Sequence, residues 1–401
     1  MSPPSRGAAR IAIASIGIVL ALAVASNSLA VWLKQTAPVT AAQLAPGNAD
    51  IVAAAARSRV IAPADIEAPA VRASIETALA RDVTLLGAIE LRASQFDASG
   101  DNARAARLFA LSDAISRRSL PTRLWLIQRS VDRGEVAGAL ENFDIALRTS
   151  EVAPDILFPV LAGATSDPAL AVPIAGLLDR PSDWRIMFLN HAIDRGGNPA
   201  DIGHIVLRMR DRRALADNQV DQKLIAALVT HSQFGLARRV HDAFHPTDGR
   251  RTPVADSDFS RPEESFPFGW GLRHDGEAWA ARDLIEGKPA LLYGSTASGD
   301  GPVATQLLLL PPGRFRISVE SAGATTDPAS PPFWSLTCGE RNGPQIALLD
   351  QPVQTGGLAS IDFAVPAGCA AQWLALNLRP SERAGGQSGA VGRVSVTPSP
   401  R

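Results

Sequence analysis

The chain has 401 residues, a length that exceeds one ordinary hydrophobic core and indicates at least two folded domains. Hydrophobic residues make up 46% of the chain, which excludes a mostly disordered protein. The formal net charge is −1 at pH 7, so the chain lacks the basic field that would favour nucleic acid as a partner.

An uncharged apolar segment, 11–33, lies near the N-terminus and is about as long as a helix that crosses a bilayer. Arg6 and Arg10 precede it, and the positive-inside rule then places residues 1–10 in the cytoplasm. We therefore predict a single-pass anchor in a bacterial inner membrane, with the bulk of the chain in the periplasm.

The same apolar segment also fits a cleaved signal peptide. Residues 23–25 read AVA, the small-x-small form that signal peptidase needs, and residues 26–28 read SNS, which weakens the apolar run. The apolar pattern resumes over 29–33, and this favours the uncleaved anchor. Both alternatives export the rest of the chain.

Between residues 44 and 245 the apolar residues recur at helical spacing, and glycine and proline separate the segments. We expect one helical domain over 44–245, built from helices of similar length with short loops. The predicted helices are 48–60, 65–81, 84–98, 102–117, 121–133, 136–149, 154–164, 168–178, 183–195, 199–213, 217–230 and 233–244.

Two parts of this domain repeat with a period of 34 residues. One part begins at Ser99 with SGDNARAARLFALSDAI, and the other begins at Arg133 with RGEVAGALENFDIAL. The matched positions in the two repeats are Gly100 and Gly134, Ala105 and Ala139, and Phe109 and Phe143.

This period resembles that of the tetratricopeptide repeats, and the resemblance covers about 84–150. It implies that the glycine forms the tight turn between two helices, the small residue lets them approach, and the phenylalanine fills the groove to the next pair. Neither repeat has the proline that commonly closes the unit. The resemblance implies a solenoid whose concave surface binds a protein partner, and it does not imply catalysis.

After residue 245 the pattern changes twice. Residues 246–265 are rich in proline, charge and small polar residues without periodicity, which is typical of a linker. Over 266–398 apolar residues alternate with polar ones, as at Phe315, Ile317 and Val319, and turn residues separate the short runs. The pattern predicts an antiparallel β-sandwich of the jelly-roll kind, so the fold class is α+β with several domains.

Aromatic residues are scarce, yet four of them fall within 266–280, which reads FPFGWGLRHDGEAWA. One interpretation is that these rings close one end of the sandwich core. The other is that exposed indoles form a platform on which a sugar ring stacks. The candidate platform residues are Trp270, Trp279, Trp334 and Trp373.

The chain has two cysteines, Cys338 and Cys369. Cys338 ends the apparent strand PFWSLTC, and Cys369 follows a turn after the apparent strand IDFAV. Both lie near strand ends, where neighbouring strands come within disulfide reach. We predict a Cys338–Cys369 disulfide within the sandwich.

We find no catalytic, cofactor-binding or metal-binding signature in the sequence. His241 and His245 have a spacing used for zinc, but no third ligand follows, and two solvated histidines at a helix end fit the sequence better. A carbohydrate-active enzyme would need paired carboxylates on adjacent strands, and the spacing pairs none of the candidates. These candidates are Asp283, Glu286, Glu320, Asp350 and Asp362.

The predicted layout resembles that of repeat proteins in bacterial exopolysaccharide and envelope systems. We therefore expect a non-enzymatic scaffold or adaptor without cofactors that supports polysaccharide biosynthesis or export. Its solenoid would bind a protein partner, and its sandwich would bind glycan or protein. Two alternatives stay open, namely a carbohydrate-active enzyme that uses the β-domain and an assembly factor for cytochrome maturation or secretion.

Overall fold

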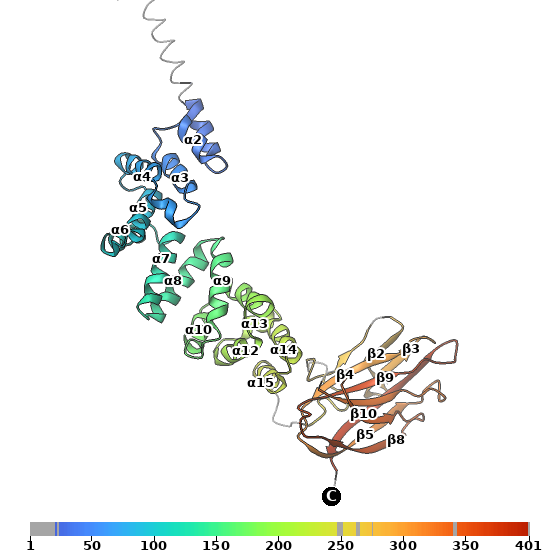
Figure 1. Ribbon diagram of the computed structural model, residues 1–401. Helices are drawn as coiled ribbons and strands as arrows, with labels where there is room; N and C mark the ends of the chain where they lie inside the picture. Colours follow the sequence, from blue (N-terminus) through green and yellow to red (C-terminus); the bar gives the residue numbers. More distant parts are fainter. Residues whose placement is uncertain are drawn as a thin grey trace, which may run out of the picture. The chain divides into compact units, whose positions relative to one another are not determined.

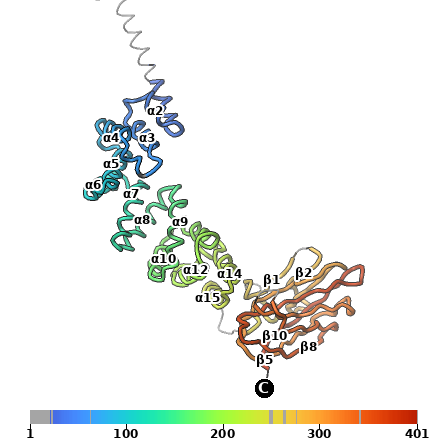
Figure 2. The backbone as a smooth tube through the Cα atoms, in the orientation of Figure 1, coloured from blue at the N-terminus to red at the C-terminus, as the bar shows by residue number. Residues whose placement is uncertain are grey.

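The chain forms two compact units, 1–157 and 158–401. Helices build the first unit where it is described, and the second unit contains helices followed by a β-sandwich (Figure 1). In Figure 2 the labelled helices are blue to green and the strands yellow to red, because every described strand follows the last described helix. The computed structural model describes residues 21, 24–246, 252–261, 265–274, 276–339 and 343–399.

The first unit consists of short helices, several of which begin at a side-chain cap. Asn48, Asp101 and Ser119 each accept a hydrogen bond from a backbone N–H in the first turn of the helix that follows. These helices are α2 (Pro38–Leu44), α3 (Ala49–Ser58), the 3₁₀ helix η1 (Pro63–Glu67), α4 (Pro69–Arg81), α5 (Leu86–Ala98), α6 (Asn102–Ile115), α7 (Leu120–Asp132) and α8 (Val136–Thr149). Helix α9 (Ala153–Ala164) spans the boundary between the units.

The two repeats correspond to the helix pairs α5–α6 and α7–α8. Gly100 and Gly134 lie between the helices of each pair, with φ of 80° and 70°, a region that favours glycine. Ala105 and Ala139 are buried on the second helix of each pair. A positive φ at both turns explains why each repeat has a glycine at this position.

The phenylalanines of the two repeats are also buried. Phe109 is 2% exposed, and its ring stacks on that of Trp125 from the next helix, with centroids 4.5 Å apart. Phe143 is 5% exposed on α8. Phe109 therefore packs between one helix pair and the next, whereas membership of the tetratricopeptide family stays a prediction.

The helices of the second unit precede the sandwich. Helix α15 (Phe234–Phe244) is strongly amphipathic: its buried residues Phe234, Ala237 and Val240 recur every three positions, and the buried His241 lies four positions after Ala237. The other helices are α10 (Ala171–Leu178), α11 (Trp184–His191), the π-helical turn η2 (Ala192–Gly196), α12 (Pro199–Arg208), α13 (Arg213–Asp217) and α14 (Val220–Thr230), followed by α15 (Phe234–Phe244).

The predicted antiparallel sandwich is confirmed. The first sheet has the strand order β1-β4-β9-β6-β7, and the second has the order β2-β3-β10-β5-β8. The strands are β1 (Gly271–Leu272), β2 (Ala278–Ile285), β3 (Lys288–Ser295), β4 (Gly301–Leu308), β5 (Gly313–Gly323), β6 (Phe333–Cys338), β7 (Gln345–Asp350), β8 (Leu358–Val365), β9 (Gln372–Leu378) and β10 (Gln387–Pro398).

Part of the predicted linker packs into the sandwich. Val254 and Phe259 are 1% and 3% exposed and belong to the same core as the strands. The side-chain amide of Gln306 on β4 donates to the carbonyl oxygen of Ala255 at 3.0 Å, and its oxygen accepts from the Ala255 N–H at 2.9 Å. The chain therefore joins the sandwich before β1. Residues 247–251 and 262–264 lie outside the described residues.

The predicted Cys338–Cys369 disulfide is confirmed. The two Cα atoms are 5.5 Å apart, and 31 positions separate the cysteines in the sequence. Cys338 ends β6, where it pairs in register with Gln372 at the start of β9. Cys369 lies in the turn that leads into β9, so the pairing of β6 with β9 brings the two cysteines together.

The predicted transmembrane helix is wrong. Among the described residues, no helix combines the length and the apolar character needed to cross a bilayer. Of the predicted span 11–33, residues 11–20, 22 and 23 lie outside the described residues. The predicted single-pass inner-membrane localisation depended on this helix and is corrected with it.

Candidate functional site

The four candidate platform tryptophans differ sharply in exposure. Trp334, Trp270 and Trp373 are 1%, 4% and 5% exposed, whereas Trp279 is 38% exposed. A sugar ring stacks only on an aromatic face that solvent reaches. Trp279 on β2 is therefore the one of these four residues that offers such a face.

Two of the four aromatic rings in 266–280 are buried, and one of them, Trp270, belongs to the sandwich core. The Trp270 ring packs edge-on against Trp334 with centroids 5.8 Å apart, and its Nε1–H donates to the carbonyl oxygen of Asp256 at 3.1 Å. Phe268 is 2% exposed and packs edge-on against His241 of α15, with centroids 5.1 Å apart. Phe268 and Trp270 thus have structural roles.

The indole of Trp279 lies across the neighbouring strand. Its cross-strand partner on β3 is Gly294, and a Cβ at Gly294 would come within 2.7 Å of Cζ2 and 3.0 Å of Nε1 of the indole. Any side chain at position 294 would displace the ring. Gly294 therefore lets the indole lie low over β3 and the sheet.

Small side chains surround the indole on this face of the second sheet. Side chains alternate between the two faces of a strand, so residues in register with Trp279, or two positions from it, share its face. The neighbours defined in this way on β2, β3 and β10 are Ala281, Leu292, Gly294, Ser388 and Ala390. Leu292 is the one large member of this set and Ala390 is buried, so Ala281 and Ser388 are the small side chains that solvent reaches beside the indole.

One carboxylate shares the same face. Asp283 lies four positions from Trp279 on β2, roughly 13 Å along the strand. It is exposed, and its Oδ1 accepts a hydrogen bond from the N–H of Leu284 at 2.8 Å. The face thus combines an aromatic ring with a hydrogen-bond acceptor, the two kinds of group that hold a polyhydroxylated ring. We call the face of Trp279, Ala281, Asp283, Gly294 and Ser388 the Trp279 face.

Two of the candidate catalytic carboxylates form ion pairs. Asp350 accepts from Arg379 at 2.7 Å, and Asp362 accepts from Arg316 at 2.8 and 2.9 Å. The hydrogen bonds from Arg316 lower the pKa of Asp362 to about 2. Asp362 is therefore ionised at neutral pH and does not fit the role of a general acid.

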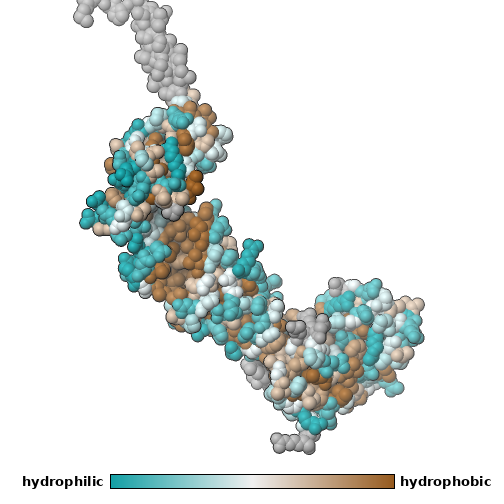
Figure 3. Space-filling model, in the orientation of Figure 1, coloured by the Kyte–Doolittle hydropathy of each residue, from teal (hydrophilic) through white to brown (hydrophobic). Residues whose placement is uncertain are grey.

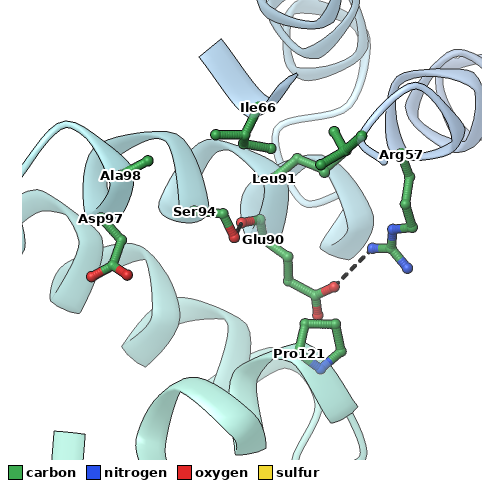
Figure 4. A pocket seen from close by; sticks show the side chains of 9 residues that line it. Arg57, Ile66, Glu90, Leu91, Ser94, Asp97, Ala98 and Pro121 are labelled. Carbon is green, nitrogen blue, oxygen red and sulfur yellow. Dashed lines mark hydrogen bonds and ion pairs between the residues drawn. The ribbon is translucent and has the colours of Figure 1, made fainter. Parts of the chain in front are cut away.

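A pocket of about 490 Å³ lies in the first unit, where α3, α5 and α7 supply lining residues (Figure 4). Val60, Ile66 and Leu91 give it apolar walls, and Asp97 and Glu90 contribute carboxylates. A pocket of this size and mixed lining fits a small ligand or a side chain of a partner.

Glu90 is the buried polar centre of this pocket. Its carboxylate is 3.0 Å from Arg57 of α3 and 3.3 Å from the hydroxyl of Ser112 on α6, and it also accepts a hydrogen bond from Ser119. Figure 4 shows the Arg57–Glu90 ion pair at the edge of the pocket. These contacts satisfy a buried charge and join α5 to α3, to α6 and to the N-cap of α7. No sequence motif indicated this residue.

His241 and His245 are not both solvated, which corrects the sequence interpretation. His241 is 4% exposed, and its Nε2 lies 3.1 Å from the hydroxyl of Ser265. The Nε2 of His245 is 3.4 Å from the buried carboxylate of Asp221. Within the described part of the chain, no group of three or more His, Cys, Asp or Glu residues could hold a metal ion.

An apolar stripe is exposed on α9. Val152 lies just before this helix, and Ile156 and Val160 follow at intervals of four residues, so the three share one face. They are 58%, 43% and 58% exposed. Figure 3 shows apolar side chains gathered in this region of the surface.

No protein-family model and no curated protein sequence matches the chain. Among solved structures, the enzymatically active domain of tailspike protein 4 from bacteriophage CBA120 matches at 16% identity and a TM-score of 0.25. This match covers 36% of the present chain and 21% of that chain.

Two other similar structures are carbohydrate-binding modules. TmCBM61, solved with β-1,4-galactotriose, has 13% identity and a TM-score of 0.26, and the match covers 37% of the present chain and all of that one. The CBM22-1 xylan-binding domain of Paenibacillus barcinonensis Xyn10C has 13% identity and a TM-score of 0.24, covering 35% and 89%. At these TM-scores the likeness carries no conclusion about a ligand of the present chain.

Proposed function

We propose that the protein is a non-enzymatic glycan-binding protein and that the Trp279 face of its sandwich is the binding surface. The observation that carries the proposal is the exposed indole of Trp279, which lies over Gly294 with small side chains beside it. A sugar ring has an apolar face of C–H groups that packs on an indole, and its hydroxyls then need hydrogen-bond partners. Ser388 offers such a partner beside the indole, and Asp283, roughly 13 Å along β2, offers one to a sugar unit further along an oligosaccharide.

The proposal is tested on a glycan array with the full chain and two variants. Trp279→Ala removes the ring, and we expect the affinity for bound glycans to fall at least about tenfold, since the stacking contact is lost. Leu358→Ala is the matched control, because Leu358 is an exposed apolar residue on the opposite edge strand of the same sheet. Equal binding by wild type and Trp279→Ala would contradict the proposal.

A protein partner of the helical region is the second function that we propose. The pocket beside Glu90 supports it, because its apolar walls of Val60, Ile66 and Leu91 suit an apolar side chain of a partner, while the Glu90 carboxylate is already paired with Arg57. Ser94→Trp would fill this pocket. Peptides selected from a random library on the wild-type protein should lose binding to Ser94→Trp but keep binding to Trp279→Ala.

The biological process is the broadest part of the proposal. Binding of glycan and of protein by one chain suits a scaffold or adaptor in polysaccharide biosynthesis or export. A glycan array tests the binding, and deletion of the gene tests the process. Unchanged polysaccharide in the deletion strain would favour the alternative of an assembly factor.

A further inference from the structure

A second pocket in the second unit lies on a different side of the sandwich from the Trp279 face. It has a volume of about 830 Å³, and residues of α14, the start of α15, the segment before β1 and β9 line it. Trp373 of β9 belongs to the first sheet, whereas Trp279 belongs to the second. The size is within the range of small-molecule sites.

Aromatic rings form one wall of this pocket. Phe266 is 40% exposed and stacks on Trp373 with centroids 5.9 Å apart. Its other neighbour is Gly271 of β1, where a Cβ would come within 2.5 Å of the Phe266 ring. Gly271 and Trp373 therefore fix the position of Phe266 at the pocket, and its exposed part offers a rigid apolar contact.

Helix α14 supplies another part of the lining. Gln222, Ala226 and Thr230 lie four positions apart on α14, are exposed, and line the pocket together. On the sandwich side, the Ser265 hydroxyl is held by Nε2 of His241 at 3.1 Å. None of the described residues that line this pocket carries a full charge.

We propose that this pocket binds an uncharged saccharide and is a second carbohydrate site, independent of the Trp279 face. A sugar ring has apolar C–H faces that suit the exposed part of the Phe266 ring, and hydroxyls that suit Gln222, Thr230 and Ser265. A charged sugar would lose hydration at this lining without gaining an ionic partner there. Two sites on one chain would also raise the avidity for a polymer that reaches both.

Saturation-transfer difference NMR on the full chain tests the pocket. The probes are cellotetraose, xylotetraose, maltotetraose and β-1,4-galactotetraose, with trigalacturonate as the charged comparison. Ala226→Trp fills the pocket from an exposed position on α14, and Ala110→Trp, at an exposed position on α6, is the matched control. Thr230→Trp fills the pocket from the end of α14. It keeps the test possible if Ala226→Trp does not fold.

We expect at least one neutral tetrasaccharide to bind, and trigalacturonate to bind at least tenfold more weakly. Ala226→Trp and Thr230→Trp should each weaken binding at least tenfold, whereas Ala110→Trp should leave it unchanged. Binding that survives both pocket variants but is lost in Trp279→Ala would overturn this site and support the Trp279 face. The reverse pattern would support the pocket as the site of that probe, and the Trp279 face would then stand or fall on the glycan array alone. Failure of every neutral probe to bind would overturn the inference.

Discussion

The sandwich and the first helical unit bury their apolar residues in different ways. The sandwich has one continuous core to which both sheets contribute, with Trp334, Tyr293 and Phe363 among its members. In the first unit the buried residues form several small clusters, for example around Ile75 and around Phe109. Helix pairs bury residues mainly against their neighbours in sequence, whereas each strand contacts residues far away in the chain.

This difference predicts how far a defect spreads in each region. A cavity in a single shared core weakens every element that packs around it. A cavity in a row of helix pairs weakens mainly the pairs beside it, because the stability of a repeat array is close to a sum of nearest-neighbour terms. The same type of substitution should therefore have a global effect in one region and a local effect in the other.

The largest expected effect is that of removing a core ring. Trp334 is 1% exposed, and its Nε1–H donates to Gln351 at 2.8 Å, so Trp334→Ala creates a cavity and leaves a buried amide oxygen without its partner. We expect Trp334→Ala and Phe109→Ala each to lower the free energy of unfolding of their unit by about 3–5 kcal/mol. Hydrogen exchange followed by mass spectrometry shows whether each variant has a global or a local effect on its unit.

Trp334→Ala should raise exchange throughout both sheets, while Phe109→Ala should raise it in α5 to α8 and spare the more distant helices. Phe143→Ala is the companion variant in the second repeat. Exchange that rises across the whole first unit in Phe109→Ala would contradict the description of this unit as a set of local clusters.

The disulfide gives the next largest effect and belongs to the sandwich alone. It closes a loop of 31 residues, for which the chain-entropy model gives roughly 3–4 kcal/mol of stabilisation. We expect the double variant Cys338→Ala/Cys369→Ala to lower the urea midpoint of the second unit and to leave that of the first unchanged. Reduction of the wild-type protein should reproduce this shift, and an unchanged midpoint in both experiments would show that the bridge does not stabilise the sandwich.

The sequence was most informative where its period was clear. Alternation at Phe315, Ile317 and Val319 predicted the strand that became β5, and the position of each cysteine at a strand end predicted the disulfide. Helical spacing and the glycines at positions 100 and 134 predicted the helix pairs. These features depend on local backbone geometry, which local sequence determines.

Long-range packing was not predictable in the same way. Residues 252–261 have the composition of a linker, yet Val254 and Phe259 are core residues because distant strands cover them. Trp279 and Trp334 are the same residue type in similar strand patterns, and only the fold places one outside and the other inside. Glu90 and His241 are buried by helices or segments that approach from elsewhere in the chain, so no local motif indicated them.

The smallest expected effect concerns His241, where the last helix meets the sandwich. Burial, helped by the nearby His245 and Arg238 and opposed by Asp242, lowers the pKa of His241 from 6.5 to about 4. A pKa lowered in the folded state means that the neutral imidazole is the folded form. The stability of the second unit should therefore be complete above about pH 6.5 and fall progressively toward pH 4.

At pH 5 the two pKa values correspond to a loss of roughly 20-fold in the folding equilibrium, or about 2 kcal/mol, relative to pH 7. This loss of stability is measured by urea unfolding of the wild type and of His241→Gln at pH 7 and at pH 5. We expect His241→Gln to be less stable than the wild type at pH 7, since Gln lacks the ring that packs on Phe268. The loss of stability between pH 7 and pH 5 should be about 2 kcal/mol smaller in His241→Gln than in the wild type. His204→Gln, at an exposed histidine on α12, should keep the wild-type pH dependence. If His241→Gln keeps it as well, the loss of stability in acid does not come from His241.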